Sequence, residues 1–208
     1  MDDDRQMVPF PEGKGKGWKA MYENVCGSRR LLEGNILAHD VFLTEIAREV
    51  KPGDRILEVG SGTGVLAYPL TTAGIHVTSL DNDEDVLFMA GINAATVGCE
   101  IEFVKGDGFE IPYPADSFRL AYSHGLLEHF TDAGIELLLD EQLRVAPIVV
   151  LGVPLDGIKG ILFGNERLMS VEEWVDILAK YDRVRGTTYM GDQMLSMTLV
   201  RMGAGEIR

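Results

Sequence analysis

The chain has 208 residues, of which 33 are acidic and 19 are basic, so its formal net charge is −14. A chain of this length can bury about 70% of the surface that its unfolded form exposes, and it needs no disulfide or metal to fold. The acidic surface disfavours a nucleic-acid partner, because it repels phosphate backbones.

Two further features narrow the class of protein. The two cysteines, Cys26 and Cys99, are far apart and match no metal-ligand spacing, which is typical of a reduced, intracellular protein. No apolar run reaches the roughly 18 residues that a membrane-spanning helix needs, and the acidic start lacks the order of a signal peptide. We therefore expect a cytoplasmic protein with no membrane partner and no bound metal.

Residues 1–50 are predicted to form a helical segment. Apolar residues recur near helical spacing at Leu37, Val41, Ile46 and Val50, which predicts one or two helices within residues 18–50. The turn residues Lys51-Pro52-Gly53-Asp54 follow, and we place the boundary to a second unit, residues 51–208, at this turn.

From residue 51 on, strands and helices alternate. The expected strands are 55–59, 76–80, 101–105, 119–123, 148–153, 184–190 and 195–202. The expected helices are 65–73, 84–97, 132–145 and one that begins after Ser170. This pattern predicts an α/β fold: a Rossmann-like, doubly wound, mostly parallel seven-stranded sheet with a C-terminal antiparallel hairpin and helices on both faces. Pro69 inside the first of these helices predicts a kink or a late helix start.

Polar residues and glycines follow the first four strands. Glu58 precedes a run of glycines at 60, 62 and 64; Asp81-Asn82, Asp107-Gly108 and Ser123-His124 end or follow the next three strands. In parallel sheets of this kind, ligands bind outside the carboxyl ends of the strands. The sequence therefore predicts a ligand site at this edge.

Two ligands fit the glycine-rich turn. The stretch GTGVLA fits the loose G-x-G-x-x-G/A pattern, and Asp81 lies 21 residues after Gly60 (81 − 60), as in proteins that bind a nicotinamide dinucleotide. A dinucleotide, however, would place its pyrophosphate close to the carboxylate of Glu58, which is costly. S-adenosylmethionine, which has an adenosine, no phosphate and two cationic groups, removes this conflict.

Four motifs in order resemble those of the class I S-adenosylmethionine-dependent methyltransferase family, in its small-molecule type. They are LEVGSGTG, VTSLDND, FVKGDGFEIPYPADSFRLAYSHGLLEHF and GNERLMSVEEW, and the resemblance extends from about Lys51 to Met202. It implies an S-adenosylmethionine-binding methyltransferase domain at 51–208, with residues 1–50 as a lid. The residues expected to bind the cofactor are Glu58, Gly60, Ser61, Gly62, Gly64, Asp81, Asn82, Asp107, Gly108 and Ser123.

Several side chains are candidates for chemistry at the acceptor. His124 is either a general base or a packing residue, and Tyr22, Trp18 and Phe163 are either acceptor contacts on a lid or ordinary aromatic packing. For Glu128 and His129 we expect a structural role, such as a hydrogen bond to loop backbone, and for His39 and His76 we expect structural or exposed positions. The methionines at 190, 194, 197 and 202 either line a soft pocket or fill the hairpin core.

In-line methyl transfer from S-adenosylmethionine to a small-molecule acceptor is the function that the sequence favours. A protein acceptor, a cofactor-binding regulator without turnover and a nicotinamide-dependent dehydrogenase stay open as alternatives. The oligomeric state and the acceptor atom do not follow from the sequence.

Overall fold

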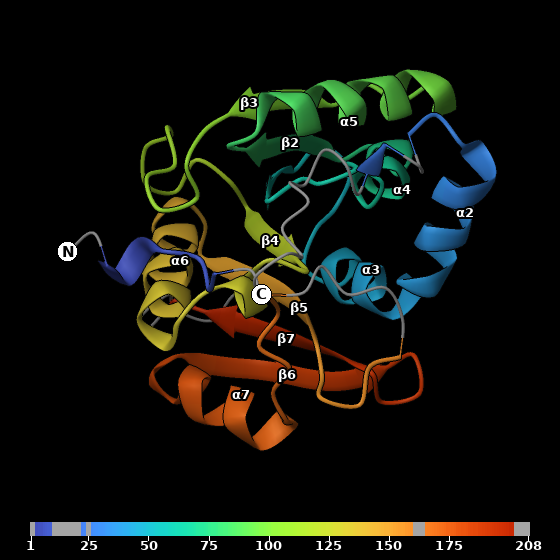
Figure 1. The fold of residues 1–208 in the computed structure, drawn as a ribbon. Helices are drawn as coiled ribbons and strands as arrows, with labels where there is room; N and C mark the ends of the chain where they lie inside the picture. The colour runs from blue at the N-terminus through green and yellow to red at the C-terminus, as the bar shows by residue number, and fades with distance from the viewer. Residues whose placement is uncertain (1–2, 10–21, 24–25, 160–164, 202–208) are drawn as a thin grey trace.

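A seven-stranded sheet is the centre of the computed structural model, which describes residues 3–9, 22–23, 26–159 and 165–201. The strand order is β3-β2-β1-β4-β5-β7-β6 (Figure 1). The strands are β1 Arg55–Val59, β2 His76–Asp81, β3 Glu102–Lys105, β4 Leu120–His124, β5 Ile148–Pro154, β6 Asp182–Tyr189 and β7 Met194–Val200. The bounds predicted from the sequence agree with these to within two residues at each end.

Among the seven strands of the sheet, β7 runs in the direction opposite to the other six. The pairs β1–β2, β1–β4, β2–β3 and β4–β5 are parallel, whereas β7 is antiparallel to both β5 and β6. The mostly parallel sheet with a terminal hairpin is therefore confirmed. The second strand of the hairpin lies inside the sheet next to β5, and the first strand, β6, forms the edge.

Helices cover both faces of the sheet (Figure 1). They are α2 Arg29–Ala38, α3 Asp40–Ala47, α4 Ala67–Thr72, α5 Glu84–Val97, α6 Asp132–Val145 and α7 Val171–Ile177, with short 3-10 turns η1 Asp3–Arg5, η2 Leu127–His129 and η3 Leu178–Lys180. One apolar core joins Leu139 of α6 and Trp174 of α7 to the sheet, and the other joins Phe42 of α3 and Leu70 of α4 to its opposite face. All seven residues of β5 are buried, because this strand packs against both cores.

Helix ends follow the local sequence signals. Asp83 caps α5 by accepting hydrogen bonds from Asp85 N and Val86 N, and Thr131 caps α6 by accepting one from Gly134 N. Ser170 and Glu173 form a reciprocal capping box at the start of α7. Pro69 is the third residue of α4, in the first turn, where a missing N–H removes no helical hydrogen bond. Of the two predicted effects of Pro69, the structure shows the late helix start and not the kink.

The topology fixes where a ligand can enter. β1 and β4 are neighbours, but the chain leaves β1 toward β2 on one side and leaves β4 toward β5 on the other. Loops at the carboxyl ends of these two strands therefore diverge, which opens a crevice between them.

Candidate functional site

The glycine-rich turn after β1 is held against the end of β2. Gly60 N and Ser61 N both donate to Leu80 O, at 2.9 and 3.2 Å. Gly60 and Gly62 have φ of 76° and 50°, in the left-handed region that favours glycine. A Cβ on Gly62 would lie 3.0 Å from the hydroxyl oxygen of Tyr22, so a side chain at this position would fill the space beside the turn.

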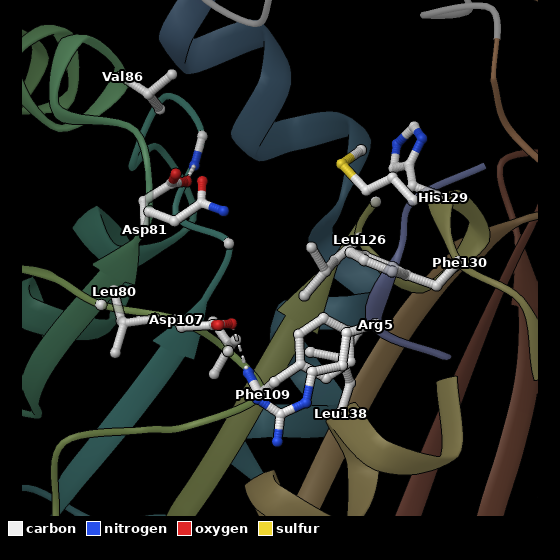
Figure 2. Close-up of a pocket in the computed structure, with 18 of the residues that line it drawn as sticks. Arg5, Leu80, Asp81, Val86, Asp107, Phe109, Leu126, His129, Phe130 and Leu138 are labelled. Carbon is white, nitrogen blue, oxygen red and sulfur yellow. Dashed lines mark hydrogen bonds between the residues drawn. The ribbon is translucent and has the colours of Figure 1, made fainter. Parts of the chain in front are cut away.

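A cavity of about 220 Å³ lies at the carboxyl ends of the first strands, beside this turn. Figure 2 shows Asp81 and Asp107 on one side of it and the apolar side chains of Leu126 and Phe130 on the other. The sequence-predicted residues that line this first cavity are Gly60, Gly62, Asp81, Asn82, Asp107 and Gly108. A wall that is acidic on one side and apolar on the other suits a ligand with hydroxyl groups and a flat apolar ring.

Asp81 is fixed at the end of β2 by backbone donors. Its Oδ2 accepts a hydrogen bond from Gly62 N at 3.2 Å, and its Oδ1 accepts one from Asp83 N at 3.0 Å. Burial raises the pKa of this carboxyl above its ordinary value, and the backbone hydrogen bonds partly oppose that shift. The side chain therefore presents a positioned acceptor to the first cavity.

The loop after β3 closes the far end of the first cavity. Asp107 Oδ1 accepts a hydrogen bond from Phe109 N at 2.9 Å. A Cβ on Gly108 would lie 3.0 Å from Leu138 Cδ2 and 3.1 Å from Val59 Cγ1, so the loop packs too closely for a larger residue. The guanidinium of Arg5 extends toward Asp107 (Figure 2) and lies 5.9 Å from the centre of the Phe109 ring.

Arg5 and Met7 also belong to this site, and the sequence, which predicted a lid within residues 1–50, did not single them out. Met7 pairs with Phe130 in an antiparallel bridge, and Val8 N donates to His129 O at 2.7 Å. These contacts place Arg5 and Met7 in the lining of the first cavity. No local pattern could have predicted them, because both contacts join residues more than 100 positions apart in the chain.

A second cavity, of about 370 Å³, adjoins the first. Tyr22, Gly60, Gly62 and Gly125 line both cavities, so one ligand could extend from one into the other past the glycine turn. The side chains that line only the second cavity include Asn35, His39, Glu58, Ser61, Leu66, His124, Glu128, Pro154, Ile158, Lys159, Glu166, Met190 and Met194.

Glu58 is a buried carboxyl group beneath the glycine turn. The hydroxyl of Ser79 donates to its Oε2 at 2.5 Å. Burial raises the pKa of Glu58 to about 8, although the Ser79 hydrogen bond acts in the opposite direction. In the absence of a ligand the neutral form of this group predominates at pH 7, and a cation beside it would favour the charged form.

His124 stands in a cluster of rings at the wall of the second cavity. Its Nε2 lies 2.9 Å from the hydroxyl oxygen of Tyr189, and its ring centre lies 4.2 Å from that of His39. Burial lowers the pKa of His124 well below its ordinary value and also lowers that of His39, so both rings are neutral at pH 7. A Cβ on Gly152 of the neighbouring strand would lie 2.5 Å from His124 Cδ2, so glycine is what leaves room for this ring.

His39 packs against two other rings, which agrees with the structural position that the sequence suggested, and it also lines the second cavity. The residue joins α2 to α3, and its neighbours, His124 and Tyr189, come from distant strands. Only the tertiary fold brings the three rings together, so no spacing in the sequence could have shown it.

The two residues after Leu127 have different surroundings. His129 Nδ1 lies 2.8 Å from Asn165 Oδ1, which agrees with the structural role expected for this histidine. Glu128, for which a structural role was also expected, is only 3% exposed and lines the second cavity. Its Oε2 has no hydrogen-bond partner among the described residues. Burial raises the pKa of Glu128 to about 8, and the charge of Glu166 adds to the shift.

Some sequence-predicted site residues lie elsewhere. Ser123 is buried in β4 and is not part of either cavity wall. Gly64 is not part of either wall; its φ of 69° contributes to the shape of the turn, and a Cβ there would lie 3.2 Å from Ala90 Cβ. Phe163 and Trp18 lie outside the described residues.

No group of three or more His, Cys, Asp or Glu side chains in residues 3–9, 22–23, 26–159 and 165–201 could hold a metal ion. Within the same ranges, every helix is too short or too polar to cross a membrane.

Comparison with known sequences gives one family and several relatives. Residues 56–146 match the family model described as "Methyltransferase domain". A stretch of 77 residues is 38% identical to the sterol 24-C-methyltransferase ERG6B of Gibberella zeae and covers 36% of this chain and 20% of that protein. A stretch of 131 residues is 28% identical to the ribosomal RNA small subunit methyltransferase A of Anaeromyxobacter dehalogenans and covers 56% of this chain and 45% of that protein. The chain therefore spans less than half the length of both relatives.

Solved structures share the fold. A SAM-dependent methyltransferase from Aquifex aeolicus superposes with a TM-score of 0.70 at 19% identity, over 88% of this chain and 98% of that chain. Residues 56–146 thus match a methyltransferase family model, and the chain shares its fold with a solved SAM-dependent methyltransferase.

Proposed function

We propose that the protein transfers the methyl group of S-adenosylmethionine to a small-molecule acceptor by in-line displacement. The observation that carries this proposal is the pair of adjoining cavities at the carboxyl ends of the strands. Asp81 and Asp107 line the first cavity and Glu58 lines the second, with the glycine turn between them. An acidic, elongated site suits a ligand that has an adenosine at one end and cationic groups at the other.

The first cavity is assigned to the adenosine. Asp81, with Asn82 beside it, would accept hydrogen bonds from the ribose hydroxyls, because its carboxylate is already positioned by backbone donors. Asp107 and Gly108 would face the adenine, with Leu126 and Phe130 as the apolar wall opposite. This use of the cavity explains why one wall is acidic and the other apolar.

The methionine part of the cofactor is assigned to the boundary between the cavities. Gly60, Ser61 and Gly62 bring backbone close to it, and Glu58 supplies a carboxyl group that a nearby cation would ionise. When bound, the cofactor supplies an activated methyl group, so this chain mainly has to align the acceptor and exclude water.

The second cavity is assigned to the acceptor. Its volume of about 370 Å³ and its apolar side chains Leu66, Ile158 and Met194 suit a small molecule. The net charge of −14 argues in the same direction, since it disfavours an RNA acceptor of the kind named for one relative. Tyr22, in the wall of both cavities, would contact both ligands, and His124 would contact the acceptor.

Residues 51–208 are proposed as the cofactor-binding domain and residues 1–50 as a segment that covers it. Tyr22 and the residues around Met7 support the second assignment, because both come from the N-terminal part and line the site. The connection 154–167 is proposed as the second part of this cover, since Pro154, Ile158 and Glu166 line the second cavity.

Isothermal titration calorimetry tests the proposed function. The protein should bind S-adenosylmethionine and S-adenosylhomocysteine and should bind NAD⁺ much more weakly or not at all. Tight binding of NAD⁺ without binding of S-adenosylmethionine would instead favour a dehydrogenase. Release of S-adenosylhomocysteine in the presence of small-molecule acceptors would then establish turnover, and its absence with every acceptor would favour a regulator.

A further inference from the structure

We propose that the methyl acceptor is an amine and that Glu128 binds it and accepts its proton. This inference rests on the proposed function and specifies the chemical class of its acceptor. The cofactor assignment gives no role to a second buried carboxyl group, that of Glu128, in the wall of the second cavity.

The second cavity has an excess of acidic groups. Three carboxyl groups, those of Glu58, Glu128 and Glu166, line it, and Lys159 is the one lysine or arginine among the described residues of its wall. Lys159 is exposed, so water screens its charge, whereas Glu128 is 3% exposed. The buried side of the cavity therefore has no cation of its own, within the described residues, to balance Glu128.

The environment of Glu128 is costly for a carboxylate without a partner. Its Oε2 has no hydrogen-bond partner among the described residues, and Tyr22, Tyr189, His129 and Glu166 are the titratable groups close to it. The nearby His129 ring is neutral at pH 7, since burial lowers its pKa. Buried charges in proteins are generally paired, so a cationic ligand would supply what this site lacks.

Glu128 and Glu58 lie at different places in the wall of the second cavity. Glu58 ends β1 under the glycine turn and accepts a hydrogen bond from Ser79 of β2. Glu128 follows β4 and lies in η2. Burial raises the pKa of Tyr189 and the charge of Glu128 adds to that shift; the hydroxyl oxygen of Tyr189 lies 2.9 Å from His124 Nε2. A Cβ on Gly125, the residue after His124, would lie 3.6 Å from Glu128 Oε1, so Glu128 lies beside the end of β4, on the side that we assign to the acceptor.

The cavity wall suits an amine with an apolar body. Met190 and Met194, at the turn of the β6–β7 hairpin, and Ile158, after β5, line the cavity together with Glu128. Methionine side chains adapt to apolar groups of different shape. One wall would thus hold the carbon skeleton, while Glu128 holds the nitrogen.

The proposed reaction consists of a proton transfer to Glu128 followed by transfer of the methyl group to nitrogen. The ammonium group donates one proton to the Glu128 carboxylate and becomes a neutral amine. The nitrogen lone pair then forms a bond to the methyl carbon while the carbon–sulfur bond breaks, and that electron pair stays on sulfur as a thioether. The product nitrogen carries one positive charge. A carboxyl group whose pKa lies near 8 can accept the proton close to neutral pH.

Three probes that share a ring but differ in charge test this inference. Benzylammonium, benzyl alcohol and benzoate are titrated by NMR at pH 7 into protein saturated with S-adenosylhomocysteine. The wild type should bind benzylammonium about tenfold or more tightly than benzyl alcohol, because a hydrogen bond to a charged group adds roughly that factor, and should bind benzoate most weakly. Glu128→Gln should lose the preference for the ammonium, whereas Glu100→Gln, the same substitution at an exposed site, should keep it.

Other outcomes would overturn the inference. Equal affinity for the ammonium and the alcohol, no detectable binding of either, or a preference that persists in Glu128→Gln would each exclude an amine held by Glu128. A lower affinity of Glu128→Gln for S-adenosylhomocysteine itself would place the residue in the cofactor site instead. If the wild type binds no S-adenosylhomocysteine, the proposed function fails before the amine question arises, so the two failures are distinguishable.

Turnover tests the proton transfer. Wild-type protein should release S-adenosylhomocysteine from S-adenosylmethionine and benzylamine at least about 100-fold faster than Glu128→Gln, the usual scale of general-base catalysis. Equal rates, or no release from wild-type protein that binds benzylammonium, would exclude Glu128 as the base.

Discussion

Asp81 links the glycine turn, the end of β2 and the first cavity in one side chain. We expect Asp81→Asn to weaken the binding of S-adenosylmethionine by about 1.5–3 kcal/mol, the contribution of one hydrogen bond to a charged group. Thermal stability without ligand should change little, because the amide oxygen can still accept from Gly62 N or Asp83 N. Calorimetry on both proteins measures the difference.

Asp85→Asn is the matched control for Asp81. It removes the same charge four residues later, on the exposed start of α5, and it should leave the affinity unchanged. An Asp81→Asn protein that folds and binds S-adenosylmethionine as tightly as the wild type would place the ribose elsewhere.

The buried carboxyl groups predict that cofactor binding releases protons. Burial raises the pKa of both Glu58 and Glu128 to about 8, so both groups are mostly protonated at pH 7 without ligand. A cationic ligand lowers these pKa values and binds the ionised form, so its affinity should rise with pH until pH passes about 8. An anionic ligand such as NAD⁺ would show the opposite trend.

Calorimetry in two buffers of different ionisation enthalpy, phosphate and Tris, measures the protons released at pH 7. Net release on binding S-adenosylmethionine is the expected result. Proton uptake, or an affinity that falls between pH 6 and pH 8, would contradict this electrostatic description of the site.

At the scale of elements, the capping box of α7 should contribute to stability and not to binding. Ser170 Oγ accepts a hydrogen bond from Glu173 N, and Ser170 N donates to Glu173 Oε2. Ser170→Ala should lower the free energy of unfolding by about 1 kcal/mol, which corresponds to a fall of roughly 2–4 °C in Tm. The affinity for S-adenosylhomocysteine should stay the same, since α7 contributes no described residue to either cavity wall.

Gly152 tests the packing behind His124. Gly152→Ala should displace the histidine ring, because a Cβ would lie 2.5 Å from its Cδ2 and 3.0 Å from the ring of Phe42. We expect slower methyl transfer, with a cofactor affinity close to that of the wild type, since the cofactor walls do not include residue 152. Unchanged kinetics in a folded Gly152→Ala protein would argue that the position of His124 is unimportant for the reaction.

Across the whole molecule, the sequence predicted what local patterns encode. The residues of α5 and α6 were predicted to the residue because an N-cap begins each helix and an apolar face or a C-terminal glycine defines its extent. The strand-end residues Asp81 and Asp107 were predicted to face a common site because parallel strands end at one edge. Each of these inferences uses the local sequence of one helix or strand, together with the rule that parallel strands end at one edge of a sheet.

Contacts between distant segments could not be predicted in this way. Arg5 and Met7 reach the first cavity because their backbone pairs near Phe130, and His39 reaches the second because α3 packs on β5 and β7. The burial of Glu128 could not be predicted either, since burial of a residue outside the regular helices and strands depends on everything packed over it. Periodicity contains no information about such contacts.

The central claim is that the cofactor occupies the first cavity and its boundary with the second, at the carboxyl edge of the sheet. Hydrogen exchange with and without S-adenosylhomocysteine tests it most directly. Protection should rise at the glycine turn, 60–66, and in the loops 81–85 and 107–110. It should also rise in the described residues of the two segments proposed as a cover, 3–9, 22–23, 26–30, 154–159 and 165–167. A third cavity, at the amino edge of the sheet beside Arg55, His76 and Glu102, should show no change. Protection at 71–77 and 98–103, with none at the glycine turn, would place the ligand at the wrong edge and contradict the claim.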